Sequence, residues 1–221
     1  MTPRVNVRSS LRAALLAAVL LGGTARAAAA DLAGCYDGHA MEIAAGLELG
    51  TDSRFRYGLS YGALDEEAQG HWQSDEASVF LTSDPVTPPR FRLVEETAGD
   101  GEVFRVRLAM PPGMNPQYFD ARLTLANGEV IDHQLGEDGL ALALEPGMRV
   151  VSAQFLLPVF ALASEPFPLS AGAGREARFR FEPNDLGKVA FAHAPLRIDG
   201  RDLLLVHHGR QFRFRKASGC N

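Results

Sequence analysis

An alternating segment from Arg54 to Tyr61 constrains the fold of this chain more than any other. Its large residues are Phe55, Tyr57, Leu59 and Tyr61, and the residues between them are Arg54, Arg56, Gly58 and Ser60. Successive side chains of an extended strand point to opposite faces, so all four large residues fall on one face. The pattern predicts a half-buried antiparallel strand.

Short extended segments separated by Gly and Pro continue along the rest of the chain. They cover residues 32–36, 41–49, 71–73, 78–82, 90–95, 103–110, 118–125, 129–135, 140–144, 148–157, 178–182 and 203–216. We expect hairpins about Gly99–Gly101, about Asn127–Gly128 and about His208–Arg210. The predicted class is all-β, with a small lipocalin-like antiparallel barrel and a β-sandwich of the transthyretin or immunoglobulin type.

The predicted domain organisation follows from a cluster of breakers over residues 111–116. We expect a signal peptide over 1–30, a barrel module over 31–110 and a sandwich module, inserted or appended, over 111–185. A C-terminal hairpin over 186–221 is expected to return to the barrel.

Residues 1–30 have the pattern of a secretory signal peptide. Arg4, Arg8 and Arg12 precede an apolar run over 13–21, which is too short to span a bilayer. We favour cleavage after Ala30 over cleavage after Ala27. Removing this segment takes away four arginines and no acid, which moves the formal charge from −5 to −9. The sequence therefore predicts a periplasmic or secreted protein with no transmembrane segment, and its acidity disfavours nucleic acid as a partner.

The two cysteines, Cys35 and Cys220, lie near opposite ends of the exported chain. An even count in an oxidising compartment predicts a disulfide between them, which would hold the last hairpin beside the first strand and close the barrel. A lipobox reading of residues 32–35, with an acylated Cys35, is the less favoured alternative because Asp31 puts a charge beside it. Two free thiols are the third alternative.

The front of the chain carries a set of spaced residues that match a known family. They are Gly34-Cys35-Tyr36, Leu47-x-Leu49-x-x-Asp52-x-x-Phe55, Tyr61, Gly70-x-Trp72 and Val79-x-Leu81. In these residues the segment from 32 to about 94 resembles the lipocalin-like half-barrel of bacterial copper-resistance and envelope-stress-sensing lipoproteins. That family carries a Cys-x-x-Cys after the first Gly and Tyr, and residues 37–46 hold no cysteine here. The resemblance implies an envelope barrel without metal sensing through thiols.

No motif in the chain identifies a reaction, since nucleophile-elbow, zinc-protease, phosphate-binding and dinucleotide-binding patterns are all absent. We therefore expect a non-enzymatic envelope protein without a cofactor, which binds a protein partner or a small apolar ligand. An apolar ligand would lie against Phe55, Tyr57, Tyr61 and Trp72 if the barrel leaves a cup. A plain packed core is the alternative.

The alternative function is metal binding, or metal-dependent catalysis, through His39, Glu42 and His71, with the acidic run 65–67 nearby. His207 and His208 are neighbours on an expected strand. Their side chains should therefore point to opposite faces, and we expect that they do not bind one ion together.

Overall fold

The computed structural model describes residues 31–98, 103–170 and 175–220, which fold as two compact units. One unit takes in the chain up to Pro85 and again from Lys188, and the other is Val86–Gly187. The second unit is thus an insertion in the first. The boundary expected between residues 110 and 111 is wrong, because the breakers there lead into a short 3₁₀ helix, η1 (Pro116–Tyr118), that connects strands within the second unit.

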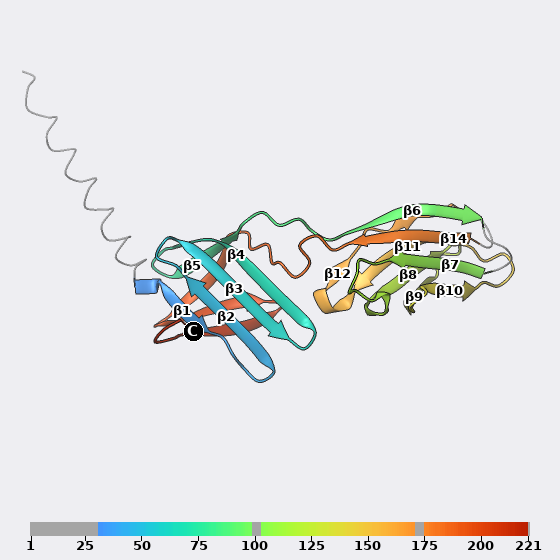
Figure 1. Cartoon of the computed structure of the whole chain (residues 1–221). Coiled ribbons are helices and arrows are strands. Elements are labelled where there is room, and N and C mark those ends of the chain that lie inside the picture. Colours follow the sequence, from blue (N-terminus) through green and yellow to red (C-terminus); the bar gives the residue numbers. More distant parts are fainter. Residues whose placement is uncertain (1–30, 99–102, 171–174, 221) are drawn as a thin grey trace, which may run out of the picture. The chain divides into compact units, whose positions relative to one another are not determined.

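The first unit is a closed antiparallel barrel. Its strands are β1 (Gly34–Asp37), β2 (Ile43–Leu49), β3 (Arg54–Tyr61), β4 (Leu64–Ser74), β5 (Ser78–Ser83), β15 (Ala194–Asp199), β16 (Asp202–His207) and β17 (Arg210–Lys216). They close in the order β1-β17-β16-β15-β5-β4-β3-β2, so strands from both ends of the chain share one sheet (Figure 1). The prediction that the first and last strands meet is confirmed by the pairing of Tyr36 with Lys216.

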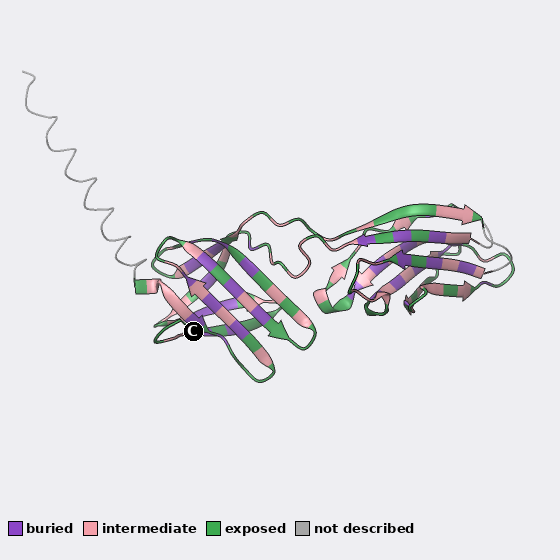
Figure 2. Ribbon diagram, in the orientation of Figure 1, coloured by how far each residue is buried: buried purple, intermediate pink, exposed green. Residues whose placement is uncertain are grey.

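Alternating side chains of each strand fill the barrel (Figure 2). Phe55, Tyr57 and Leu59 of β3 are buried as expected, whereas Tyr61 at the end of the strand is 42% exposed. The buried core residues are Tyr36, Ala45, Leu47, Leu49, Phe55, Tyr57, Leu59, Ala68, Trp72, Val79, Leu81, Phe191, Leu196, Leu203, Leu205, Phe212 and Phe214.

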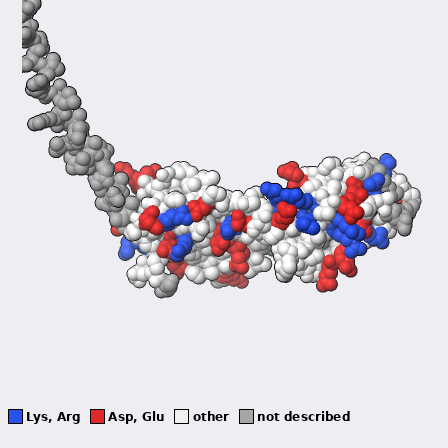
Figure 3. Space-filling view, turned by 45° about the horizontal axis from the view of Figure 1, so that its top comes forward, with Lys and Arg blue, Asp and Glu red and all other residues white. Residues whose placement is uncertain are grey.

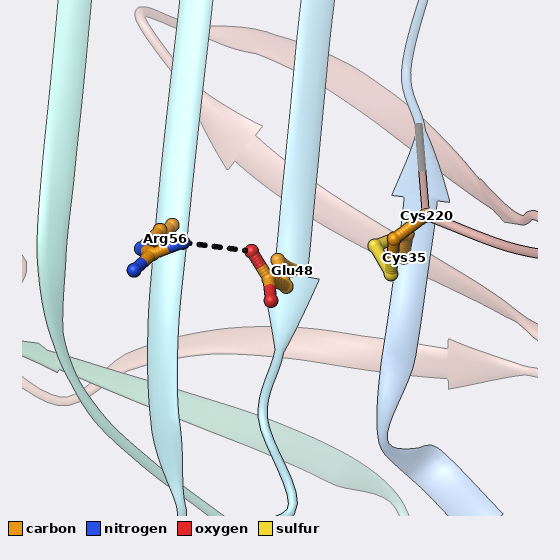
Figure 4. Close-up of a disulfide and its surroundings, with 4 residues drawn as sticks. All are labelled: Cys35, Glu48, Arg56 and Cys220. Carbon is orange, nitrogen blue, oxygen red and sulfur yellow. Dashed lines mark ion pairs between the residues drawn. A yellow bond between two sulfur atoms is a disulfide. The ribbon is translucent and has the colours of Figure 1, made fainter.

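A disulfide joins Cys35 of β1 to Cys220, which follows β17, with the two Cα atoms 5.2 Å apart. The predicted pairing is confirmed, and among the described residues no cysteine is free. Figure 4 shows the bond beside the ion pair between Glu48 of β2 and Arg56 of β3, in which the two side chains lie 3.6 Å apart. The covalent link therefore holds β1 against the end of the chain where the barrel closes.

The second unit is a β-sandwich of two sheets. One sheet has the order β10-β7-β14-β6, with β6 (Arg90–Ala98), β7 (Val103–Ala109), β10 (Leu140–Ala143) and β14 (Arg175–Glu182). The other has the order β12-β11-β8-β9, with β8 (Asp120–Leu125), β9 (Val130–Gln134), β11 (Val150–Leu157) and β12 (Leu162–Ala163). Strand β13 (Phe167–Pro168) also pairs with β11, and a short 3₁₀ helix, η2 (Pro158–Phe160), lies between β11 and β12 in the chain. Phe104, Phe119, Phe155, Phe179 and Phe181 belong to the one core that both sheets share.

Strand β14 lies between β6 and β7, so the hairpin expected about Gly99–Gly101 is wrong. It pairs antiparallel with β6 and parallel with β7. Ala177, Phe179 and Phe181 are at most 2% exposed, and this apolar face gives β14 the central place. The hairpin expected about Asn127–Gly128 does join β8 to β9. In the parts of the chain that the structure describes, no helix is long and apolar enough to cross a bilayer.

Candidate metal centre

Three potential metal ligands meet at one end of the barrel. The Nε2 atom of His207 lies 2.9 Å from Oε2 of Glu66, and the Nε2 atom of His208 lies 2.8 Å from Oε1 of the same carboxylate. The ligand atoms of the three side chains all lie within 4.8 Å of one another. The carboxylate of Glu66 therefore bridges the two imidazoles.

Glu66 reaches this position because it faces the barrel interior. Glu66 lies on the same face of β4 as Ala68 and Trp72, both of which are buried, and its own side chain is only 9% exposed. In the closed sheet, β5 and β15 lie between β4 and β16. The contact between Glu66 and His207 thus joins two strands that are not neighbours.

His208 turns toward the same carboxylate because β16 ends one residue earlier. His207 pairs with Arg210, which leaves a turn of two residues, His208 with φ +48° and Gly209 with φ +69°. Positive φ at both positions is the geometry of a type I′ hairpin turn. The expectation that the two imidazoles point to opposite faces is therefore wrong: their ring centroids lie 3.9 Å apart.

The carboxylate of Glu66 is held in its charged form. Burial raises its pKa most strongly, but the hydrogen bonds from His207 and His208 together outweigh burial and hold the pKa of Glu66 below its ordinary value. The side chain of His207 is 16% exposed and that of His208 is 38% exposed. The cluster therefore combines a half-buried anion with two imidazole nitrogen atoms, and the imidazole of His208 is exposed to solvent.

Tyr57 of β3 places a hydroxyl beside this cluster that has no hydrogen-bond partner among the described residues. Its residue is 4% exposed, and its ring meets the ring of His207 edge-on with centroids 6.1 Å apart. Burial, and then the negative charge of Glu66, raise the pKa of the Tyr57 phenol. A buried hydroxyl without a partner costs free energy, so its presence in the barrel calls for an explanation.

The residues expected to hold a metal are not brought together. His39 is exposed and contacts Asp37, and His71 pairs across β3–β4 with Arg54 at the start of β3. Glu42 precedes β2, whose first residue is paired with the last residue of β3. Glu42 and His71 therefore lie at opposite ends of an eight-residue strand, which spans roughly 25 Å.

The residues expected to bind an apolar ligand are in large part core residues. Phe55, Tyr57 and Trp72 belong to the barrel core, and the indole of Trp72 donates a hydrogen bond to the carbonyl of Gly50 at 2.9 Å. Tyr61 lies at the rim with the guanidinium of Arg210 5.7 Å from its ring centroid. An apolar ligand at these residues stays a prediction.

A shallow depression of about 870 Å³ lies over β1 to β4. Gly46 and Gly58 are paired directly in it, and a Cβ added at either residue would meet no atom closer than 4.0 Å. The absence of side chains at this pair leaves room beside Glu48 and Arg56. Of the four residues expected to form a ligand cup, only Tyr57 borders this depression.

Comparison with known proteins finds no match. No family model, no curated protein and no solved structure matches this chain. The resemblance of residues 32–94 to envelope lipoproteins therefore stays a prediction, and the function has to be argued from the site itself.

Proposed function

We propose that this protein binds one divalent transition-metal ion, with zinc as the best-fitting ion, through Glu66, His207 and His208. The observation that carries the proposal is the convergence of two imidazole Nε2 atoms on the two oxygens of one half-buried carboxylate. Glu66 of β4 and His207 of β16, two strands that are not neighbours, meet there with His208 of the turn after β16. The proposed activity is binding, and the absence of catalysis stays a prediction.

The ligand set favours zinc on chemical grounds. Two histidines and one glutamate are a known zinc ligand set, in which a fourth position is left for an exchangeable group. Imidazole also suits copper, whereas calcium and magnesium prefer all-oxygen sites. Both cysteines are held in the disulfide, so no thiolate competes for the ion among the described residues.

The present distances require little movement for an ion to enter. Ligand atoms of a tetrahedral zinc site lie roughly 3.4 Å apart, because zinc bonds to nitrogen and oxygen are about 2.1 Å long. The two nitrogen to oxygen contacts of Glu66 are 2.8 and 2.9 Å, and the ligand atoms of the three side chains lie within 4.8 Å of one another. Entry of an ion would therefore lengthen each contact of Glu66 by about half an ångström.

An extracytoplasmic location supports this function. The Cys35–Cys220 disulfide is of the kind that forms in oxidising compartments such as the periplasm or the exterior. The predicted signal peptide, residues 1–30, lies outside the described residues. We propose that the protein is periplasmic or secreted and takes up its ion there.

Equilibrium dialysis against zinc followed by elemental analysis tests the proposal. We expect about one zinc per chain, lost in His207→Ala and in Glu66→Gln. In His208→Asn the turn should survive, because asparagine tolerates positive φ, while the imidazole is removed. His39→Ala, which changes an exposed histidine outside the cluster, should keep its zinc. Stoichiometric zinc in all three cluster variants would refute the site.

A further inference from the structure

We infer that the metal centre has an open fourth position for a small oxygen-donor ligand, and that the hydroxyl of Tyr57 donates a hydrogen bond to that ligand. This inference rests on the proposed metal site. Its ligand class is water, exchangeable for the carboxylate group of a small acid. Tyr57 would act as a positioning residue and not as a ligand of the ion.

The buried hydroxyl is the first observation behind this inference. Tyr57 is 4% exposed, and its hydroxyl lacks a partner among the described residues. Tyr36 provides a contrast within the same barrel, because its buried ring carries a hydroxyl that donates to the carbonyl of Leu32 at 2.6 Å. An unpaired buried hydroxyl is uncommon in folded proteins, since it loses its hydrogen bonds to water without replacement.

The location of Tyr57 links its hydroxyl to the metal cluster. In the β3–β4 pair, Leu59 lies opposite Glu66 and Tyr57 lies opposite Ala68, so Tyr57 and Glu66 are diagonal neighbours on the inner face. The ring of His207 meets the ring of Tyr57 edge-on.

The number of ligands leaves a place for the oxygen donor. Glu66 and the two histidines supply three ligands, and a tetrahedral ion takes a fourth. The side chain of His208 is 38% exposed, so a small molecule can reach the cluster from solvent. The phenol of Tyr57 carries a proton that it can donate to a bound oxygen.

Cobalt(II) in place of zinc makes both the binding of the ion and the binding of acetate visible by absorption. Binding of cobalt to the full chain produces visible absorption bands, and a titration with acetate then changes those bands if acetate enters the coordination sphere. We expect Tyr57→Phe to bind cobalt with an affinity within about twofold of the unaltered protein. Its affinity for acetate should fall about tenfold or more, because a hydrogen bond to a charged oxygen is lost.

The controls separate this inference from the proposed function. Tyr36→Phe removes the other buried hydroxyl of the barrel and should leave the acetate affinity unchanged. Tyr57→Phe should fold, since it removes only a hydroxyl that has no hydrogen-bond partner among the described residues. Failure of the unaltered protein to bind cobalt would refute the metal site. Cobalt binding with no acetate response, or with equal acetate affinity in Tyr57→Phe, would keep the metal site and refute the role of Tyr57.

Discussion

The imidazole rings of His207 and His208 lie 3.9 Å apart although the two residues are neighbours in the chain. Neighbours within a strand point away from each other, so the proximity depends on the positive φ of His208 in the turn. The proposed metal site therefore depends on a backbone conformation as much as on its side chains.

Gly209→Ala should weaken zinc binding several-fold without changing a ligand. Gly209 has φ +69°, and alanine in this conformation costs about 1 kcal/mol, which favours other arrangements of the turn. Gly200→Ala is the matched control, since Gly200 has φ +65° in the turn between β15 and β16, away from the cluster. Calorimetric titration with zinc should show reduced affinity in the first variant only, and equal losses in both would argue against the dependence on the turn.

Replacing Cys35 and Cys220 together by serine should destabilise the barrel by about 2–5 kcal/mol, because the bond closes a long loop in the unfolded chain. The two residues are 185 positions apart. Chemical denaturation followed by the fluorescence of Trp72, the single tryptophan of the chain, reports on the barrel alone. An unchanged unfolding midpoint would show that strand pairing closes the barrel without help from the bond.

Gly70→Ala should destabilise the barrel by about 3 kcal/mol. A Cβ at Gly70 would lie 2.1 Å from the carbonyl oxygen of Thr82 and 2.9 Å from the ring of Phe55, so the β4–β5 pair would have to shift. At Gly46, also within a barrel strand, an added Cβ would meet nothing within 4 Å, and alanine there should change the stability by no more than about 0.5 kcal/mol. The same fluorescence-monitored denaturation measures both variants, and equal effects would contradict this packing argument.

The contribution of Glu66 to stability should depend on pH in a defined window. Its pKa is lowered on folding from an ordinary value of 4.5, so the charged form is favoured by the folded state. Its stabilisation is therefore complete above about pH 4.5 and is lost as the pH falls through the folded-state pKa. Denaturation of the metal-free protein and of Glu66→Gln from pH 5 to pH 3 should show a stability difference that shrinks on acidification. A difference that stays constant over this window would contradict the lowered pKa.

In the second unit, Arg107 and Arg178 lie directly opposite each other on β7 and β14. Glu176 accepts a hydrogen bond from Arg178 and forms an ion pair with Arg107. Figure 3 shows basic and acidic side chains intermixed over this unit. Like charges opposite each other are unfavourable, so Glu176→Gln should lower the thermal unfolding midpoint at low salt, and the loss should shrink in 1 M salt.

The matched control for Glu176→Gln is Glu182→Gln, which removes the partner of one arginine, Arg92, and should have a smaller effect. Both variants are compared by calorimetry at the same two salt concentrations. A loss that is the same in low and high salt would point to packing and not to charge.

The sequence predicts the faces of strands well because side-chain alternation is a local property. The spacing of large residues predicts the buried face of β3 and the last hairpin, in which Phe212 and Phe214 point inward. The even number of cysteines predicts the Cys35–Cys220 bond. The partner of a strand is a different matter. Nothing in the alternation of β14 shows that it separates β6 from β7, so the expected boundary after residue 110 lies two strands too late in the chain.

The metal cluster could be predicted only in part, for a similar reason. Glu66 belongs to the acidic run 65–67, and the turn after His207 was expected. The residue at which β16 ends could not be predicted from the sequence. The two-residue turn between β16 and β17 is what directs His208 toward Glu66. Such turns are usually recognised from asparagine followed by glycine, and here the two residues are histidine and glycine. The approach of Glu66 to His207 also requires the closed order of the barrel.

The insertion of Val86–Gly187 between β5 and β15 sets an order of assembly during synthesis. Strands β1 to β5 leave the ribosome first, but their closing partners, β15 to β17, follow only after the whole inserted unit. That unit is continuous in sequence and has its own core, so every partner it needs is present before the barrel is complete. Residues 194–220 are needed for closure of the sheet, for the disulfide and for the proposed metal site. All three therefore form together, late in the synthesis of the chain.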